Sequence, residues 1–312
     1  MTAFDFNTGT PRGLGRKTRT HMELNYSVVT SPPVAAASVV MLRDGAQGLE
    51  VFLVRRHQAS NVLGGAHVFP GGKVDTADAA PAWQPLLDQD AATLQAALAE
   101  PETDASAASA IFVAALREAF EEAGVLFAPA CTPVQLAQVR QAIGEGVDLR
   151  TALTHAELSL STQAVVPWSR WVTPTSPSVM DKRFDTRFFL AAVPPSQTAV
   201  HDDFETTDSI WLSPRAALTQ YWDGQLKFAP PQILSLAALA RFANVAAALA
   251  DAHSRPPPVV RPEPFDDNGV RVICYPGDPR HSQRQIAVPG PTRMSFRNQR
   301  FEPDGGFDAF FN

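Results

Sequence analysis

The chain is poor in cysteine and has no long apolar run. Its 312 residues contain two cysteines, Cys131 and Cys274, which lie far apart and outside any metal-ligand spacing. This usage argues against a disulfide scaffold and predicts the reducing cytoplasm as the location. No stretch reaches the roughly 18 apolar residues of a membrane span, and no apolar signal-peptide segment follows the start. We therefore expect neither a membrane partner nor secretion.

A positive charge excess is also missing. Lys and Arg total 26 against 32 Asp and Glu, which gives a formal net charge of −6. Proteins that coat nucleic acids carry the opposite balance, so we expect no nucleic-acid partner. Isolated basic residues still suit a small phosphorylated substrate.

What the sequence does contain is a helix with an acidic face. Residues 107–116 have no Gly or Pro and are rich in helix formers, and Gly124 supplies a stop. At about 100° per residue, three carboxylates share one narrow arc: Glu118, Glu121 and Glu122. The opposite arc carries the apolar residues Phe112, Val113, Leu116 and Phe120. One face is therefore predicted to be buried and the other to be acidic.

Clustering of these carboxylates is locally unfavourable. Like charges three or four residues apart repel by about 0.2–0.5 kcal/mol per pair, and the negative end of the helix dipole adds to this cost. Arg117 offsets part of the repulsion by reaching Glu121 at i+4. Mg²⁺ or Mn²⁺ would offset far more, because hard divalent cations prefer carboxylate oxygens. The helix alone leaves two interpretations open, a metal site or a solvated acidic face.

A glycine-rich stretch, GGAHVFPGGKVD, lies upstream at 64–75. Its glycines allow close approach of the backbone to a ligand and leave N–H groups free for phosphate oxygens. An ordinary Pro-Gly-Gly turn is the alternative.

Together the two pieces resemble the Nudix hydrolase family, whose box reads G, five residues, E, seven residues, then R-E-U-x-E-E-x-G-U, where U is aliphatic. REAFEEAGV at 117–125 matches the second half at every fixed position, with Ala at the first U. Gly72 matches the opening glycine, and FPGG at 69–72 resembles the usual lead-in. The resemblance implies an α/β fold, an α/β/α sandwich around a mixed sheet, and metal-dependent cleavage of a diphosphate joined to another group.

The resemblance also implies roles for particular residues. Glu118, Glu121 and Glu122 would bind Mg²⁺ or Mn²⁺ and form the catalytic set together with Arg117, which would orient a glutamate. Gly71, Gly72 and Lys73 would contact the metal or the diphosphate. The general base stays open between one of the three glutamates and a later acid, Glu205 or Asp208, for which a solvated turn carboxylate is the alternative.

Two features depart from the family box. Asp78 stands where the family has glutamate, and 38 residues, 79–116, separate it from Arg117 where the family has seven. The 31 extra residues place an insert at about 79–109. The segment 76–110 holds thirteen alanines, six acidic residues and no Lys or Arg. We expect the insert to form one or two short helices and to bulge beside the cleft, and it is open whether Asp78 reaches the site.

An interrupted box is also a feature of one Nudix branch, typified by a peroxisomal coenzyme A diphosphatase. Segments 66–72, 117–126 and 183–191 resemble that branch. The resemblance favours coenzyme A or acyl-coenzyme A as substrate. The alternatives are NADH, ADP-ribose or a nucleotide sugar, or a non-catalytic binding module that kept the Nudix fold.

Three further sets of residues outside the box each have two interpretations. The aromatic pair Trp168 and Trp171 is predicted to be core or groove wall, with a clamp for adenine or pantetheine as the alternative. Arg187, like Arg183, is predicted either to steer phosphates or to pair with a neighbouring aspartate. His67 is predicted to be structural, with substrate contact as the alternative.

The chain is predicted to divide into a flexible arm at 1–30, the Nudix domain at 31–225 and an extension at 226–312. Within the domain we expect strands at 34–42, 49–56, 184–193 and 209–212 and helices at 133–143 and 214–220. The extension is predicted to begin with one long helix at 230–253, which docks on the domain or pairs with a second subunit in a homodimer. A polyproline-type linker at 255–264 and short β-strands within 270–301 are expected to follow.

Overall fold

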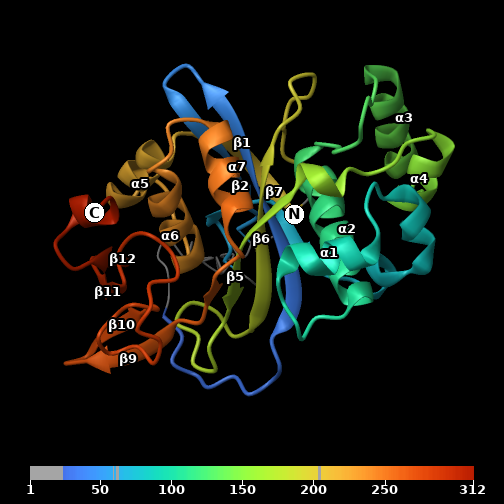
Figure 1. Cartoon of the computed structure of the whole chain (residues 1–312). Coiled ribbons are helices and arrows are strands. Elements are labelled where there is room, and N and C mark those ends of the chain that lie inside the picture. The colour runs from blue at the N-terminus through green and yellow to red at the C-terminus, as the bar shows by residue number, and fades with distance from the viewer. Residues whose placement is uncertain (1–23, 59, 61–62, 203–204) are drawn as a thin grey trace, which may run out of the picture.

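The strand β1 (Val34–Gly45) alternates between two buried faces. Val39 and Met41 belong to one apolar cluster, and Val40 and Leu42 belong to another. Because successive side chains of a strand point to opposite faces, β1 must lie at the centre of a sheet covered on both sides. The computed structural model, which describes residues 24–58, 60, 63–202 and 205–312, has this arrangement (Figure 1).

The central sheet has eight strands and is mixed. β1 pairs in parallel with β6 (Phe184–Ala192) and antiparallel with β2 (Gly48–Arg56). The main path is β3-β2-β1-β6-β5-β8, while β4 pairs with β1 and β7 pairs with β2. The other strands are β3 (His67–Val68), β4 (Gly71–Lys73), β5 (Val166–Val172), β7 (Thr206–Leu212) and β8 (Val259–Val260). The four strands predicted from the sequence are confirmed as β1, β2, β6 and β7, whereas β5 was not predicted as a strand.

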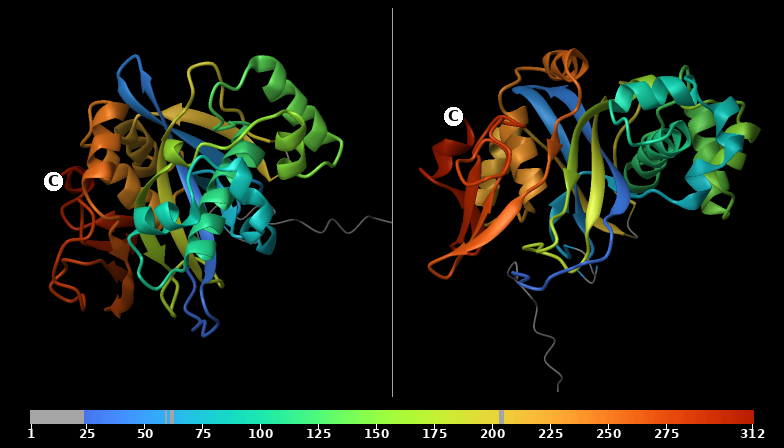
Figure 2. Two further views of the ribbon diagram at one scale, coloured as in Figure 1. Left: turned by 45° about the vertical axis from the view of Figure 1, so that its right-hand side comes forward. Right: turned by 60° about the horizontal axis from the view of Figure 1, so that its bottom comes forward.

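One face of the sheet is covered by α2 (Ala105–Ala123), whose apolar residues Phe112 and Leu116 pack in the cluster that contains Val39. The remaining helices of this side lie around α2 (Figures 1 and 2). They are η1 (Thr76–Ala79), η2 (Pro81–Leu86), α1 (Ala91–Leu98), α3 (Pro133–Gly144), α4 (Leu149–His155) and η3 (Thr162–Ala164).

The opposite face is covered by α5 (Pro214–Trp222), α6 (Pro230–Leu239) and α7 (Val245–Ser254). The α/β/α sandwich around a mixed sheet is therefore confirmed. A second, four-stranded antiparallel sheet packs beyond these helices (Figure 2). It consists of β9 (Glu263–Asp267), β10 (Val270–Cys274), β11 (Arg293–Arg297) and β12 (Arg300–Pro303), followed by η4 (Phe307–Phe310). Among the described residues, no helix is long and apolar enough to cross a membrane.

The prediction of one helix at 230–253 is wrong. The chain leaves the helical path after Leu239, and Asn244 begins α7 as its N-cap by accepting a hydrogen bond from the Ala247 N–H. Asp44, at the end of β1, accepts a second hydrogen bond from the Val245 N–H at 2.8 Å. An N-cap and a contact from a distant loop together outweigh the continuous apolar pattern.

The Pro-rich segment at 255–264 is also not a free linker. Val259 and Val260 add a parallel edge strand to β5, and the Pro258 carbonyl accepts a hydrogen bond from the Arg170 N–H. Proline is tolerated at a sheet edge because no partner strand needs its missing N–H.

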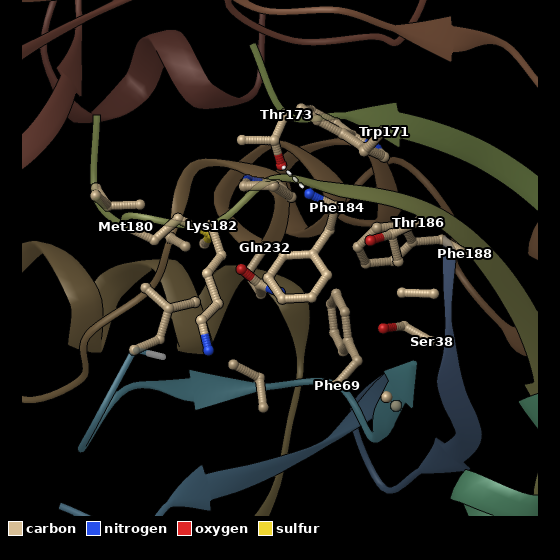
Figure 3. A pocket seen from close by; sticks show the side chains of 18 of the residues that line it. Ser38, Phe69, Trp171, Thr173, Met180, Lys182, Phe184, Thr186, Phe188 and Gln232 are labelled. Carbon is tan, nitrogen blue, oxygen red and sulfur yellow. Dashed lines mark hydrogen bonds between the residues drawn. The ribbon is translucent and has the colours of Figure 1, made fainter. Parts of the chain in front are cut away.

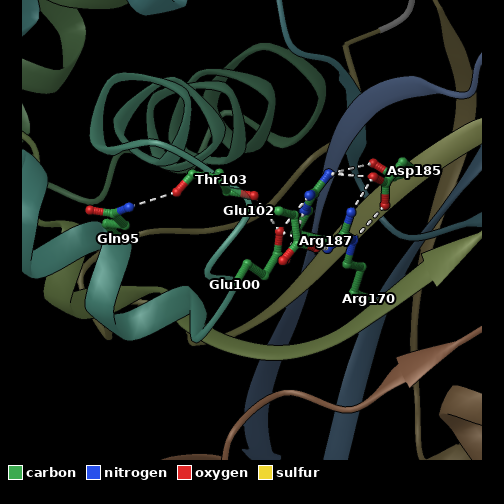
Figure 4. Close-up of polar contacts among 7 residues, drawn as sticks. All are labelled: Gln95, Glu100, Glu102, Thr103, Arg170, Asp185 and Arg187. Carbon is green, nitrogen blue, oxygen red and sulfur yellow. Dashed lines mark hydrogen bonds and ion pairs between the residues drawn. The ribbon is translucent and has the colours of Figure 1, made fainter.

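The box insert packs as a layer and does not bulge beside the cleft. Trp83, Leu94 and Leu98 belong to the buried cluster under α2. In the turn after α1, Glu100 pairs with Arg187 and Arg170, which project from β6 and β5 (Figure 4). The acidic composition of the insert thus meets the arginines of the sheet, and the two short helices predicted for it are confirmed as η2 and α1.

The predicted arm at 1–30 lies mostly outside the described residues. The described part, 24–30, is hydrogen-bonded to the loop that follows β5. Asn25 donates from its backbone N–H to the Ser178 carbonyl and from its side chain to the Met180 carbonyl, and Val29 donates to Thr175. This segment therefore helps to fix that loop.

Candidate active site

A cap at each end fixes where α2 begins and where its acidic last turns stop. Asp104 accepts a hydrogen bond from the Ala107 N–H at the start. Gly124, with φ of 63°, ends the helix and donates its N–H to the Phe120 carbonyl. Glycine adopts this left-handed conformation without strain. The last turns of α2 lie beside the glycine strand β4, where the Gly71 N–H donates to Glu122.

The three predicted metal ligands differ in burial. Glu122 is 3% exposed and accepts a hydrogen bond from the Gly71 N–H at 2.9 Å. The Glu118 side chain is 13% exposed, and the Glu121 side chain is 41% exposed. Burial raises the pKa of Glu122 to about 8 and that of Glu118 to about 7. The two inner carboxylates therefore lack enough positive charge around them to stay ionised as ordinary glutamates do.

Arg117 links the helix to the first half of the box. Its guanidinium donates to both carboxylate oxygens of Asp78, at 3.0 and 3.1 Å, and to the Lys73 carbonyl at 3.1 Å. Its Nη1 donates to Glu118 at 2.9 Å and to Glu121 at 2.7 Å. Arg117 thus orients two of the glutamates.

Asp78 does reach the site, despite the long insert behind it. Its side chain is 1% exposed and also accepts a hydrogen bond from the Asp75 N–H at 2.8 Å. The insert leaves from the end of η1 and returns at the start of α2, so the two halves of the box stay in contact across it. Aspartate here has the reach to hold the arginine of the box.

The two glycines of β4 leave room that any side chain would fill. A Cβ on Gly72 would lie 2.2 Å from a Glu118 carboxylate oxygen. A Cβ on Gly71 would lie 2.4 Å from the Ala37 carbonyl oxygen on the paired strand β1. The glycines are therefore required for the close approach of β4 to both α2 and β1.

These residues lie on the wall of a cavity of about 660 Å³. One part of its lining is charged and contains Glu118, Glu121, Arg117, Lys73 and Arg56. Another part is mainly apolar and contains Phe69, Trp171, Met180, Phe184 and Phe188 (Figure 3). A ligand with a charged group and a long apolar group matches this division.

Of the two later acids, only Glu205 lines the cavity within the described chain. Its charge contributes to the raised pKa values of Glu118 and Glu122. Asp208 lies on β7 opposite Arg55 of β2. Glu205 is therefore the later acid that the fold brings to the site.

The other predicted side groups are mostly structural. Trp168 and Trp171 are both buried, and Trp171 also forms cavity wall. Arg187 pairs with Asp185 and Glu100. Burial lowers the pKa of His67 to about 4, so this histidine is neutral and belongs to the core beside Phe228.

Sequence reasoning missed several cavity residues. Lys182 and Arg56 bring positive charge, Gln232 comes from α6, and Pro264 and Ile273 come from the second sheet. No local motif marks them, because they are distant in sequence and meet only in the fold. The pair of arginines that ends β2 was visible, but nothing in its spacing tied it to the box.

The donor set suits a hard divalent cation in its chemistry, since it is made of carboxylate oxygens. In the described part of the chain, no group of three or more His, Cys, Asp or Glu side chains is gathered closely enough to hold a metal ion. The reason is visible in Glu121, whose carboxylate is turned to Arg117. Glu118 and Glu122 are the two carboxylates that face the glycine strand.

A mixed sheet between helical layers, with a glycine strand against the acidic end of a helix, defines this chain as a Nudix-fold protein. A crystal structure of a NUDIX hydrolase from Alicyclobacillus acidocaldarius agrees with this class. It is 29% identical and superposes with a TM-score of 0.57, covering 71% of this chain and 97% of that one.

The family can be stated more closely. The model of the NUDT19 Nudix domain matches residues 27–239, and the chain belongs to this family. The human acyl-coenzyme A diphosphatase NUDT19 is 28% identical over 238 residues, and the Gallus gallus protein of the same name is 28% identical over 266 residues. These matches cover 64% and 67% of this chain. The predicted Nudix membership and branch are confirmed.

The similarity does not extend over the whole of these relatives. It spans 63% of the human protein, less than two thirds of its length, and 68% of the Gallus gallus protein.

Nudix hydrolases generally use divalent metals.

Proposed function

We propose that the chain hydrolyses a diphosphate linkage in a nucleoside-diphosphate derivative, with coenzyme A or an acyl-coenzyme A as the leading substrate. Mg²⁺ or Mn²⁺ would be held by Glu118, Glu121 and Glu122. The substrate proposal is supported by the names of the human and Gallus gallus relatives, both acyl-coenzyme A diphosphatases.

One observation carries the proposal. Two buried carboxylates converge on the glycine strand: Glu118, which lines the cavity, and Glu122, which accepts from the Gly71 N–H. Burial raises the pKa of both above that of an ordinary glutamate, despite the nearby arginines. A purely structural acid in the core is normally paired with a base, as Asp78 is with Arg117. Glu118 shares that same arginine, and Glu122 accepts from the Gly71 N–H. A divalent cation would supply the missing charge and favour the ionised form of both glutamates.

Different residues of the chain would then have different roles in hydrolysis. The bound metal would neutralise phosphate oxygens and acidify the attacking water. Arg117, fixed by Asp78, would orient Glu118 and Glu121. The glycine strand and Lys73 would position the diphosphate, and Glu205 is the candidate that would accept the proton of the water. Attack of water at phosphorus would break the anhydride P–O bond and leave a phosphate monoester on each of the two products.

Other substrates and a second function are also compatible with the site. NADH, ADP-ribose and nucleotide sugars share the diphosphate and would fit the charged part of the cavity. A binding module without turnover is the alternative from another class, and the ion pair that turns Glu121 to Arg117 is the observation in its favour. A cytoplasmic location, a homodimer and the choice between Mg²⁺ and Mn²⁺ stay predictions.

The test is a mass-spectrometric hydrolysis panel with each metal. It contains coenzyme A, an acyl-coenzyme A, NADH, ADP-ribose and nucleotide sugars, with Glu122→Gln as the matched variant. We expect coenzyme A to yield 3′,5′-ADP and 4′-phosphopantetheine, and the variant to be inactive. Cleavage of another compound alone would replace the substrate. No turnover by a folded protein that binds Mn²⁺ would favour the binding module.

A further inference from the structure

Two buried polar groups in the cavity wall have no hydrogen-bond partner among the described residues. The side-chain oxygen of Gln232, at the start of α6, and the hydroxyl of Ser178, in the loop after β5, make no hydrogen bond in the described chain. These residues are 7% and 6% exposed, and both line the cavity. Buried polar groups in proteins are nearly always hydrogen-bonded, so two exceptions in one cavity point to a ligand that supplies the partners.

The surroundings of these two groups are mainly apolar. Phe69, Phe184 and Phe188 line the same cavity, and Figure 3 shows the Gln232 side chain among the lining residues. Pro264 of β9 and Ile273 of β10 add a wall from the second sheet, beyond the range of the family match. We call this part of the cavity the apolar chamber. It would take a ligand segment that is largely hydrocarbon with a few polar groups.

The polar groups narrow the chemistry of that segment. An amide oxygen accepts a hydrogen bond, and a serine hydroxyl can donate one. Their partners would be an N–H and a C=O, which an amide group carries together. Phosphates suit the charged part of the cavity, where Lys73 and Arg56 are found. The Gln232 side-chain oxygen only accepts hydrogen bonds and does not suit an ionised phosphate oxygen.

We propose that the apolar chamber binds the amide-bearing arm of the substrate, the pantetheine part of coenzyme A. The Gln232 side-chain oxygen accepts a hydrogen bond from an arm amide N–H, and the Ser178 hydroxyl donates one to an arm carbonyl. This inference rests on the proposed function, because it names the part of the substrate that this cavity recognises apart from the diphosphate.

The position of Ser178 is held from outside the chamber. Asn25 donates its backbone N–H to the Ser178 carbonyl at 2.9 Å and its side-chain amide to the carbonyls of Pro177 and Met180. The loop is therefore fixed by its backbone, and removal of the Ser178 hydroxyl changes the chamber without changing the loop.

The experiment compares the two halves of coenzyme A as ligands of the full-length protein. Binding of 4′-phosphopantetheine and of 3′,5′-ADP is measured by calorimetry for wild type, Gln232→Met and Ser178→Ala. The matched control is Ser235→Ala. Ser235 lies on α6, is buried and also lacks a partner, but it is not a cavity residue in the described chain.

Loss of one neutral hydrogen bond should weaken binding of 4′-phosphopantetheine by roughly threefold to tenfold in each chamber variant. Binding of 3′,5′-ADP, and all binding by Ser235→Ala, should stay unchanged. The melting temperature of Ser178→Ala and Ser235→Ala should not fall, because each substitution removes a hydroxyl that has no partner in the described chain. These results would support the proposal.

Two results would overturn it: no binding of 4′-phosphopantetheine to the wild type, or equal affinity in all variants. The hydrolysis panel separates this failure from that of the proposed function. If the protein hydrolyses coenzyme A but the chamber variants bind 4′-phosphopantetheine as the wild type does, the proposal for the apolar chamber is refuted and the proposed function stands. Binding of the arm half with the expected losses, but without hydrolysis, refutes the activity and leaves the chamber in place.

Discussion

Replacement of Glu100 by Gln should destabilise the fold, because this residue fastens the box insert to the sheet. Glu100 accepts a hydrogen bond from Arg187 Nε at 3.0 Å and lies 3.0 Å from Arg170 Nη1 (Figure 4). Its side chain is 7% exposed, as is that of Arg187. Removal of one charge from a buried ion pair typically costs about 3–5 kcal/mol. Glutamine keeps part of the hydrogen bonding, so we expect about 3 kcal/mol in the free energy of unfolding.

Glu102 provides a matched control in the same turn. It also pairs with Arg170, but its side chain is 61% exposed. An exposed ion pair contributes less than about 1 kcal/mol. Glu102→Gln should therefore unfold near the wild-type urea concentration, whereas Glu100→Gln should unfold at a clearly lower one. Equal losses in the two variants, or a loss below about 1 kcal/mol for Glu100→Gln, would refute the argument that the insert is held by a buried charge.

Three further predictions concern the site and its pH dependence. Gly72→Ala should lower kcat by roughly a hundredfold, because its Cβ would displace the Glu118 carboxylate, while Gly144→Ala, which meets no atom within 4 Å, should be neutral. In EDTA, the raised pKa values of Glu118 and Glu122, about 7 and 8 against an ordinary 4.5, mean that the native state keeps protons that the unfolded chain has lost. The melting temperature should then fall as the pH rises from about 5 to 8, and saturating Mg²⁺ or Glu122→Gln should reduce that fall. A flat profile in EDTA would contradict the raised pKa values of the two buried glutamates. The lowered pKa of His67, about 4 against 6.5, adds an opposite loss as pH falls from 6.5 to 4, which His67→Gln should remove in the same melting series.

The sequence predicted the central fold well where a pattern is local. The apolar runs of β1 and β2 are buried in the sheet, and the apolar face of α2 is buried against it, as the sequence predicted. The box glutamates and Arg117 were identified because their spacing within one helix carries the chemistry. The i+4 pairing of Arg117 with Glu121 is confirmed, but spacing did not show that Glu121 is far more exposed than Glu118.

The errors arose where a distant contact decides the local structure. The apolar run after Pro230 predicts one helix, but Asp44, 201 residues earlier in the chain, accepts a hydrogen bond from the Val245 N–H at the start of α7. The insert was predicted to bulge because length added at a loop tip costs little closure entropy. Its acidic composition instead pairs with Arg170 and Arg187, which face it from the sheet.

The same distinction explains why the chemistry of the diphosphate was easier to predict than the rest of the substrate. The box is compact in sequence, so one motif places both the carboxylates and the glycine strand. The apolar chamber draws on β5, β6, α6 and the second sheet, and Ser178, Gln232 and Ile273 have no spacing in common. A change in the second sheet should therefore alter which arm is accepted while the box remains intact. Ile273→Ala enlarges the chamber, so the change in KM for acyl-coenzyme A should depend on the length of the acyl chain, while the metal requirement stays as it is. An equal change in KM for every chain length would place Ile273 outside substrate recognition.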